Sequence, residues 1–224
     1  MDAKRLAGLI DSTLLRADST AKEIEDLATG AALWGFAAVC VPPCHVGFAA
    51  RVLKGTEVRV ATVAGFPLGF QAAGVKLIEA LKAFAEGASE IDMVMNISRF
   101  KSGCYEAVAD ETGSIVKALP DAVIKVIIEA ALLTDDEKAV ACGIAAASGA
   151  HFVKTSTGFG PGGATAKDVR LLSRVAAGRI KVKAAGGIKD LQGALDMVEA
   201  GAERLGTSSA AGIMEELAAR TRNS

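Results

Sequence analysis

Apolar positions along the chain fall into short β-branched runs that alternate with longer stretches of helical periodicity. The first run, residues 9–11, is followed by Asp18, Ser19 and Thr20, which are typical of a helix N-terminus, and by a helix expected to reach Trp34. The same unit of strand and helix recurs along the rest of the chain. The expected strands are residues 9–11, 36–41, 57–63, 90–95, 123–129, 151–154, 180–184 and 204–206. The later helices are expected to begin near residues 43, 71, 98, 134, 164 and 190, with a last one after residue 206.

Glycines mark the places where predicted helices end. Gly87, Gly149 and Gly201 each follow a helical stretch and precede the next apolar run, as a glycine C-cap requires. Strictly alternating strands and helices in 224 residues, without a Pro/Ser-rich linker, favour a closed barrel over an open sheet with a second domain. A doubly wound sheet stays open as an alternative, but no Gly-x-Gly-x-x-Gly follows the first strand. We therefore predict the α/β class and a single TIM (β/α)8 barrel spanning residues 1–224.

Composition and charge narrow the expected partners to small molecules. Hydrophobic residues make up 51% of the chain and aromatic residues only 4%, so Val, Ile, Leu and Ala must fill the core. The formal net charge is −1 and no Lys/Arg run exceeds a pair, which gives no electrostatic footprint for nucleic acid or an anionic membrane. No apolar run approaches the roughly 20 residues needed to span a bilayer. We expect a soluble, cytoplasmic protein.

Three polar residues stand at positions where strands of a barrel open onto its active face. Asp92 lies on the fourth predicted strand, Lys154 ends the sixth and Lys183 lies on the seventh. Active sites of such barrels form at the carboxyl ends of the strands. Strands six and seven should be neighbours, so two inward lysines would repel each other, and neutralising one of them relieves this.

The size of this effect decides whether a lysine can act as a nucleophile. A free lysine, with a pKa of ~10.4, is unprotonated in only about one molecule in 2500 at pH 7. A second ammonium at ~4 Å contributes roughly 4 kcal/mol at an effective dielectric near 20, or about three pKa units, before burial is added. We therefore predict that Lys154 is the neutral amine that forms an imine, that Lys183 is the perturbing cation, and that Asp92 transfers protons.

Each of these residues also has a structural interpretation. A strand-end lysine can simply reach solvent, and a strand-end carboxylate can cap a loop. Lys125, in the middle of the fifth strand, can face the helix layer or form a structural ion pair, and it is left out of the predicted catalytic set. The pairing of two strand-end lysines favours the catalytic interpretation.

Glycine-rich turns after the last three strands predict a phosphate site. Residues 155–158, Gly186 with Gly187, and residues 206–209 combine glycines with hydroxyl side chains on one side of the rim. Glycines let backbone amides approach an anion, and a helix beginning near Ser208 would present its positive end. Placement after strands seven and eight matches the phosphate site of such barrels. The expected substrate is a sugar phosphate.

The cysteines suggest neither disulfides nor a metal site. Cys40, Cys44, Cys104 and Cys142 form no Cys-x-x-Cys pair and are expected to be free thiols. Cys40 and Cys44 with His45 match no common metal-ligand spacing. Cys40 ends the second strand, where it can line the pocket or act as a small hydrophobic residue.

These motifs, in order, resemble the deoxyribose-phosphate aldolase family over nearly the whole chain. The resemblance rests on residues 11–15, 39–42, 62–69, 90–94, 126–129, 152–159, 162–165, 182–188 and 206–209. Two departures are Ser12, where many members carry histidine, and the Gly160-Pro161 pair in the loop after strand six. They affect the expected shape of the rim and the fine substrate preference.

The resemblance implies a class I, Schiff-base aldolase that needs no cofactor and no metal ion. It implies that Lys154 forms the imine with acetaldehyde or deoxyribose phosphate, while Lys183 and Asp92 transfer protons. The implied sugar-pocket residues are Asp11, Thr13 and Cys40. The implied phosphate-binding residues are Gly158, Gly186, Gly187, Ser208 and Ser209.

The predicted reaction is reversible cleavage of 2-deoxy-D-ribose 5-phosphate to acetaldehyde and D-glyceraldehyde 3-phosphate, in deoxyribose phosphate catabolism. One alternative is a Schiff-base barrel aldolase acting on a keto acid or a ketose phosphate, which the paired lysines alone do not exclude. Another is a barrel that binds sugar phosphates without catalysis. A homodimer is the expected assembly, because exposed barrel helices commonly pair.

Overall fold

Eight parallel strands close into one barrel in the computed structural model, which describes residues 1–222. Each strand pairs with the next in the sequence, and β8 closes the barrel against β1. The strands are β1 (Ile10–Thr13), β2 (Ala38–Cys40), β3 (Arg59–Ala64), β4 (Glu90–Val94), β5 (Val123–Ile127), β6 (Phe152–Lys154), β7 (Lys181–Ala185) and β8 (Arg204–Thr207). The predicted TIM barrel is therefore confirmed, with each observed strand within or close to its expected range.

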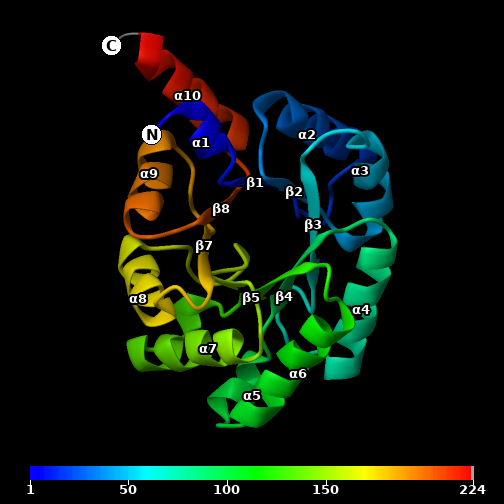
Figure 1. Cartoon of the computed structure of the whole chain (residues 1–224), viewed down its shortest axis with the longest axis vertical. Helices are drawn as coiled ribbons and strands as arrows, with labels where there is room; N and C mark the ends of the chain where they lie inside the picture. Colours follow the sequence, from blue (N-terminus) through cyan, green and yellow to red (C-terminus); the bar gives the residue numbers. More distant parts are fainter. Residues whose placement is uncertain (223–224) are drawn as a thin grey trace.

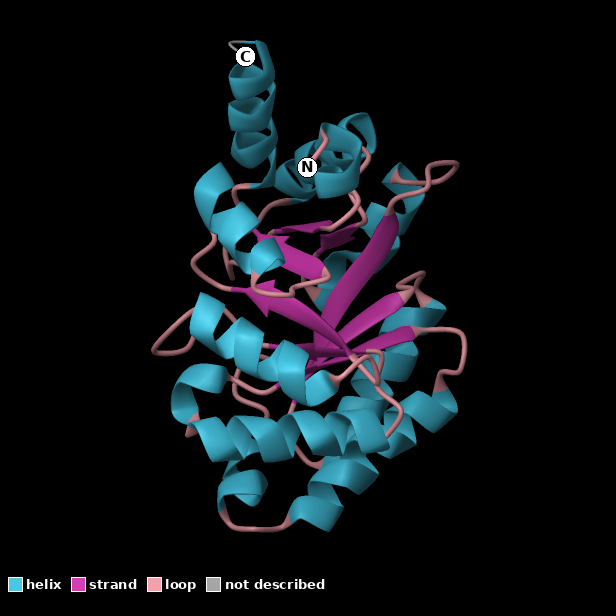
Figure 2. Cartoon of the chain, turned by 60° about the vertical axis from the view of Figure 1, so that its left-hand side comes forward, coloured by secondary structure: helices cyan, strands magenta, loops and turns pink. Residues whose placement is uncertain are grey.

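Helices surround the barrel as an outer layer (Figure 1, Figure 2). They are α1 (Ala3–Ala7), α2 (Ala21–Trp34), α3 (Val46–Val52), α4 (Ala73–Ala85), α5 (Ile97–Lys101), α6 (Tyr105–Ala118), α7 (Asp135–Ala147), α8 (Ala166–Ala176), α9 (Leu191–Glu199) and α10 (Ala210–Arg222). Short 3-10 turns, η1 (Pro43–His45) and η2 (Ala130–Leu132), follow β2 and β5. The periodicity did not predict α1, a helix too short to show a repeat. Among residues 1–222, no helix is long and apolar enough to cross a membrane.

Local signals in the sequence fix where these helices begin and end. Thr20 caps α2 through a reciprocal capping box with Glu23, in the polar segment expected at that N-terminus. Gly87, Gly149 and Gly201 adopt φ values of 110°, 81° and 106°, conformations in which glycine avoids the strain of a Cβ. The predicted glycine helix ends are therefore confirmed.

The apolar core lies mainly between the barrel and the helices. Its buried side chains are largely Val, Ile, Leu and Ala, as the composition predicts. Inside the barrel, a small apolar cluster of Ala38, Cys40, Ala61 and Val63 occupies the side of β2 and β3. The rest of the interior carries charged side chains from the other strands. Strand residues alternate between the two faces, so this polar interior forms without disturbing the outer core.

Candidate active site

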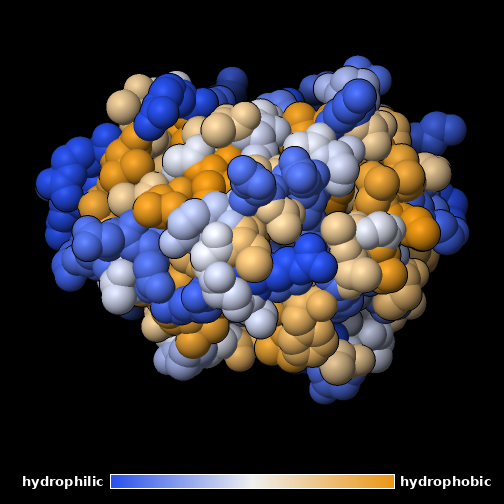
Figure 3. Space-filling view, turned by 90° about the horizontal axis from the view of Figure 1, so that it is seen from below, coloured by the Kyte–Doolittle hydropathy of each residue, from blue (hydrophilic) through white to orange (hydrophobic). Residues whose placement is uncertain are grey.

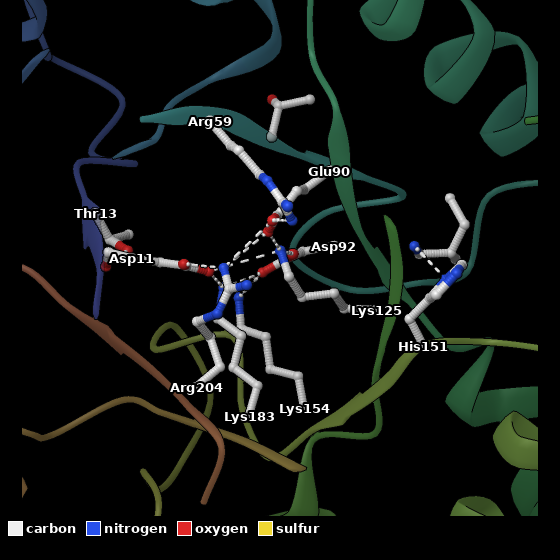
Figure 4. Close-up of polar contacts among 12 residues, drawn as sticks. Asp11, Thr13, Arg59, Glu90, Asp92, Lys125, His151, Lys154, Lys183 and Arg204 are labelled. Carbon is white, nitrogen blue, oxygen red and sulfur yellow. Dashed lines mark hydrogen bonds and ion pairs between the residues drawn. The ribbon is translucent and has the colours of Figure 1, made fainter. Parts of the chain in front are cut away.

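Lys154 and Lys183 lie side by side inside the barrel, as predicted from the order of their strands. The register of β6 and β7 pairs the two residues directly. Both side chains point to Asp92 on β4, whose Oδ2 lies 2.8 Å from Nζ of Lys154 and 2.7 Å from Nζ of Lys183 (Figure 4). One carboxylate oxygen therefore accepts hydrogen bonds from both amines.

Lys125 joins this group, which sequence reasoning did not predict. Its side chain points inward, and its Nζ lies 2.6 Å from Oδ1 of Asp92 and 2.6 Å from Oε2 of Glu90. The structural ion pair left open for Lys125 is therefore observed, and it includes Asp92 itself. Both oxygens of Asp92 are thus occupied by ammonium groups.

Asp11 and Arg204 complete the cluster at the junction of β1 and β8. Asp11 accepts a hydrogen bond from Lys183, and its Oδ1 lies 2.7 Å from Arg204. Arg204 also lies 3.1 Å from Glu90. We call these buried residues the inner ionic cluster, which consists of Asp11, Glu90, Asp92, Lys125, Lys154, Lys183 and Arg204.

Charge balance within the inner ionic cluster favours one neutral amine. Three carboxylates face four basic side chains, so a fully charged cluster carries one uncompensated positive charge in a dry interior. Arg59, whose half-exposed side chain lies 3.2 Å from Glu90, adds a further positive charge at the edge of the cluster. An uncompensated buried charge is costly, whereas deprotonation of one lysine makes the cluster neutral.

Lys154 is the amine whose environment favours the neutral form. Burial lowers the pKa of Lys154, the negative charge of Asp92 opposes this, and the positive charge of Lys183 adds to the lowering. Burial also disfavours the charge of Lys183, but Asp11 and Asp92 outweigh it and raise the pKa of Lys183. The two pKa values therefore move in opposite directions, down for Lys154 and up for Lys183. Burial lowers the pKa of Lys154 more than repulsion by Lys183 does.

Asp92 stays ionised over the same pH range. Burial alone would raise the pKa of Asp92, but Lys125, Lys154 and Lys183 lower it well below its usual value. The pKa of Lys125 is raised because the attraction of Asp92, Asp11 and Glu90 exceeds the effect of burial. Lys154 therefore faces an anion and two cations that do not titrate near neutrality.

The lowered pKa of Lys154 predicts the pH dependence of its reactivity. Only the neutral amine attacks an aldehyde, so trapping by acetaldehyde and cyanoborohydride should fall about tenfold per pH unit below that pKa. The rate should become constant at a pH below the ~10.4 of an ordinary lysine. Trapping rates measured by mass spectrometry between pH 5 and pH 10.5 check this, and a rate still rising at the upper end would contradict it.

A cavity of about 600 Å³ opens at the carboxyl ends of the strands above the inner ionic cluster. Six of the predicted site residues line it, namely Thr13, Lys154, Gly158, Gly186, Gly187 and Ser208. Asp11, Cys40, Asp92 and Lys183 do not line it and are buried within the barrel. Lys154 is therefore the member of the inner ionic cluster that reaches the cavity.

The rim of the cavity is built from turns whose backbone amides can face a ligand. Gly186 and Gly187 have φ values of 87° and 79°, so two successive residues adopt the left-handed conformation that favours glycine. Gly163 packs so closely on this turn that a Cβ there would lie 2.3 Å from the carbonyl oxygen of Gly186. Ser209 lies outside the cavity lining, and its amide donates to Oγ1 of Thr207 at 2.9 Å.

The model of one protein family, described as DeoC/LacD family aldolase, matches residues 5–214 of this chain. The chain belongs to this family. It is 52% identical over 206 residues to the deoxyribose-phosphate aldolase of Streptococcus equi subsp. zooepidemicus, covering 92% of this chain and 94% of the relative. It is 50% identical over 214 residues to the deoxyribose-phosphate aldolase of Caldanaerobacter subterraneus subsp. tengcongensis, covering 94% and 93%.

Solved structures agree with this family. A structure titled "QR15, an Aldolase" has a TM-score of 0.93 and 44% identity, covering 97% of this chain and 98% of that one. The deoxyribose phosphate aldolase from Aeropyrum pernix, described as having a unique tetrameric structure, has a TM-score of 0.92 and 35% identity, covering 98% and 93%. The chain is thus an aldolase, which is a lyase, and the predicted resemblance is confirmed.

Two basic residues that sequence reasoning missed line the cavity of this aldolase. Lys189 follows the Gly186-Gly187 turn, and Arg16 follows β1. Arg16 is paired with Asp18 and Glu23, at 3.1 Å and 2.7 Å. A signal for Lys189 was present in the sequence, because a lysine two residues after a glycine pair can meet an anion bound there.

The cysteines of this aldolase agree with the expectation of free thiols. Cys40 is buried in the barrel, where burial raises the pKa of its thiol to about 11, whereas Cys44 is exposed. Cys40 thus belongs to the small apolar cluster rather than to the cavity lining. Across residues 1–222, no three His, Cys, Asp or Glu side chains are grouped as metal ligands would be.

Proposed function

We propose that this aldolase reversibly cleaves 2-deoxy-D-ribose 5-phosphate to acetaldehyde and D-glyceraldehyde 3-phosphate through an imine at Lys154. The observation that carries the proposal is a buried lysine of lowered pKa that alone links the inner ionic cluster to the 600 Å³ cavity. The identity of about 50% to proteins named deoxyribose-phosphate aldolase supports the choice of substrate.

In the proposed mechanism, the neutral amine of Lys154 attacks C1 of the open-chain aldehyde and forms a carbinolamine. Loss of water gives a protonated imine, whose positive charge draws electrons from the C2–C3 bond. The C3 hydroxyl gives up its proton, the C2–C3 bond breaks, and glyceraldehyde 3-phosphate leaves. The remaining enamine takes a proton at C2, and water then releases acetaldehyde and restores the amine. No redox step or external electron acceptor is involved, so we propose that no cofactor or metal ion is required.

Asp92 and Lys183 are proposed to transfer the protons of these steps. Asp92 contacts Nζ of Lys154 at 2.8 Å, where water is lost from the carbinolamine and later added back. Lys183 contacts the same carboxylate oxygen at 2.7 Å and can relay a proton through it. Asp11 is proposed to hold Lys183, while Thr13 and Cys40 shape the sugar side of the barrel.

The phosphate is proposed to bind at the far side of the cavity from Lys154. The proposed donors are the backbone amides of Gly158, Gly186, Gly187 and Ser208 and the hydroxyls of Ser208 and Ser209. Lys189 would add a positive charge that has no ion-pair partner among the described residues. Backbone amides at glycine turns and a nearby cation are the usual features of phosphate sites.

Replacing Lys189 with methionine tests the phosphate side of this proposal. We expect KM for 2-deoxyribose 5-phosphate to rise about tenfold, because a charge-assisted hydrogen bond of ~1.5–3 kcal/mol is lost. The turnover number should change little, since Lys189 is remote from the bonds that break. Steady-state kinetics with 2-deoxyribose 5-phosphate and with unphosphorylated deoxyribose check this. An equal rise in KM for unphosphorylated deoxyribose would contradict it.

An activity assay with a panel of donors tests the proposed function. Purified protein should release acetaldehyde from 2-deoxyribose 5-phosphate, detected with a coupled alcohol dehydrogenase, without any added metal ion. Ketose phosphates and keto acids should give rates lower by at least about 100-fold, because their carbon skeletons do not fit the same cleavage. Faster cleavage of a ketose phosphate or keto acid would favour another Schiff-base aldolase. Absence of any cleavage would favour a non-catalytic binding protein.

We further propose that the chain works as one domain in the cytoplasm, in the breakdown of deoxyribose phosphate. The closure of all eight strands into one barrel supports a single domain. A cytoplasmic location is supported by the substrate, because a phosphorylated sugar is charged and does not cross a bilayer freely. Small phosphorylated sugars and aldehydes, rather than nucleic acid or membranes, are the proposed partners.

We propose that two copies pair as a homodimer through the apolar face of α4. Val75, Ile78 and Leu81 are exposed on this helix, and Leu68 and Phe70 are exposed in the preceding loop. Figure 3 shows apolar surface gathered on the side where α4 lies in Figure 1. Such a face usually marks an interface. Sedimentation should give a dimer mass for the wild type and a monomer for Ile78→Glu. A monomeric wild type would contradict the proposal.

A further inference from the structure

Glu129 is a buried carboxylate whose hydrogen bonds, within residues 1–222, come from one neutral residue, Thr157. The buried carboxylates that face a lysine or arginine nitrogen at ion-pair distance are Asp11, Glu90, Asp92, Glu111 and Asp168. Glu129, with an exposed fraction of 3%, has no such cation among the described residues. Buried carboxylates are rarely left without a cation, so this side chain calls for an explanation.

The contacts of Glu129 are concentrated on one residue of the loop after Lys154. Its carboxylate accepts hydrogen bonds from the backbone amide of Thr157, at 3.3 Å, and from the Thr157 hydroxyl. Oγ1 of Thr157 in turn accepts from the amide of Phe159 at 3.0 Å. A Cβ at position 160 would lie 2.7 Å from Cδ of Glu129, so the turn packs directly on the carboxylate. The carboxylate of Glu129 thus packs against the turn of residues 157–160 and forms hydrogen bonds with it.

The backbone of Glu129 is held in a strained conformation that directs its side chain to this turn. Its φ and ψ are 48° and 65°, in the left-handed region that favours glycine. Backbone hydrogen bonds fix the chain on both sides of Glu129. The amide of Ile128 donates to the carbonyl oxygen of Lys154 at 3.0 Å, and the amide of Ala130 donates to the carbonyl oxygen of Thr155 at 2.8 Å. A residue without a side-chain role would be expected to be glycine here.

The supported turn is a wall between two cavities. Thr157 and Phe159 line both the 600 Å³ cavity that contains Lys154 and a second cavity of about 290 Å³. Glu129 lines only the second. Gly158, between Thr157 and Phe159, is a proposed phosphate-binding residue. Without the carboxylate of Glu129, the turn could move into the second cavity.

We propose that Glu129 is a positioning residue that acts through Thr157 to hold the 157–160 turn in the place where it binds the substrate phosphate. This inference rests on the proposed function and deepens it. It separates phosphate recognition from imine formation, because Glu129 contacts the turn through Thr157, whereas the side chain of Lys154 contacts Asp92. The loss of Glu129 should therefore weaken binding of the phosphorylated sugar without impairing the amine.

Two substitutions with different effects on stability test this role. Glu129→Met removes both oxygen acceptors and keeps the strained backbone, whereas Glu129→Gly removes them and relieves the strain. We expect KM for 2-deoxyribose 5-phosphate to rise about tenfold in both variants, the loss of one charge-assisted hydrogen-bonding group. The rate of trapping by acetaldehyde and cyanoborohydride should stay within about twofold of wild type, because acetaldehyde carries no phosphate. The melting temperature should be higher for Glu129→Gly than for Glu129→Met.

A double-mutant cycle tests whether the effect passes through Thr157. Thr157→Val removes the hydroxyl donor, and its effect on KM should not add to that of Glu129→Met. Thr157→Ser, which keeps the hydroxyl, should retain a KM near that of the wild type. Additive effects would overturn the proposed route through Thr157.

Four other outcomes would overturn the inference. A KM that rises only in the less stable variant would indicate a structural role alone, as would an equal loss of acetaldehyde trapping. An unchanged KM in both Glu129 variants, with an active wild type, would exclude the role of Glu129 and leave the proposed function intact. A wild type that traps acetaldehyde but does not cleave the phosphorylated sugar would contradict the proposed function and the inference together.

Discussion

Replacing Lys154 with methionine is expected to lower the turnover number by at least about 10⁴-fold, because the side chain that forms the imine is lost. Lys154→Arg should be equally inactive, since a guanidinium stays protonated and cannot form the imine. Neither change should prevent folding, although arginine adds a charge to a buried site. Cleavage of 2-deoxyribose 5-phosphate, with circular dichroism to verify the fold, measures the effect.

Lys181→Met provides a matched control for Lys154→Met. Lys181 begins β7 and is exposed, and it makes no contact with the inner ionic cluster. Its replacement removes one lysine from a neighbouring strand and should change turnover by less than about twofold. Substantial turnover in a folded Lys154→Met protein would contradict the assignment of the nucleophile.

Replacing Asp92 with asparagine is expected to separate the protonation state of Lys154 from the proton transfers that Asp92 makes. Asp92 raises the pKa of Lys154 against the lowering by burial, so its removal should lower that pKa further and leave the amine neutral. Acetaldehyde should therefore still be trapped at pH 7, but more slowly than by the wild type, because the carbinolamine loses water without the help of Asp92. Turnover should nevertheless fall about 10²- to 10⁴-fold, because the carboxylate no longer transfers protons.

The same substitution should also destabilise the protein. Lys125 and Lys183 share the charge of Asp92, and breaking a buried ion pair by removing one partner costs about 3–5 kcal/mol. Asp168→Asn is the control, because Asp168 pairs with Lys138 at 2.6 Å outside the barrel. It should lower the free energy of unfolding without lowering turnover. Equal turnover losses in the two variants would show that Asp92 acts only through stability.

Much of the fold followed from the periodicity of the sequence. In a parallel barrel each strand is buried on both faces, and the apolar runs at 36–41 and 123–129 contain observed strands β2 and β5. The glycines that follow helices marked where one strand-and-helix unit ends and the next begins. The short helix α1 was less predictable, since a segment of five residues holds too few apolar positions to establish a helical period.

The three candidate catalytic residues were selected because strand ends of a barrel meet on one face. That rule selected Asp92, Lys154 and Lys183, which the structure brings together around one carboxylate oxygen. It did not select Lys125, because the sequence does not show which face of a doubly buried strand points inward. The partners of Lys125, Glu90 and Asp92, become visible only once the register of β4 and β5 is known.

Residues that act from loops were the hardest to predict. Glu129 comes just after the apolar strand β5, yet its carboxylate contacts Thr157, 28 positions later. Arg16 and Lys189 line one cavity although they lie at opposite ends of the chain. Their positions depend on turn conformations and on barrel closure, which brings the β1 and β7 loops close together. Local sequence patterns carry neither kind of information.

The central claim is that the amine of Lys154 is neutral enough to form an imine while its neighbours stay charged. Borohydride reduction in the presence of acetaldehyde, followed by peptide mapping, tests it most directly. We predict a single ethyl group, on the peptide that contains Lys154 and on its side-chain nitrogen. An ethyl group on Lys183 or Lys125, or an unchanged mass under conditions in which the protein cleaves its substrate, would contradict the assignment.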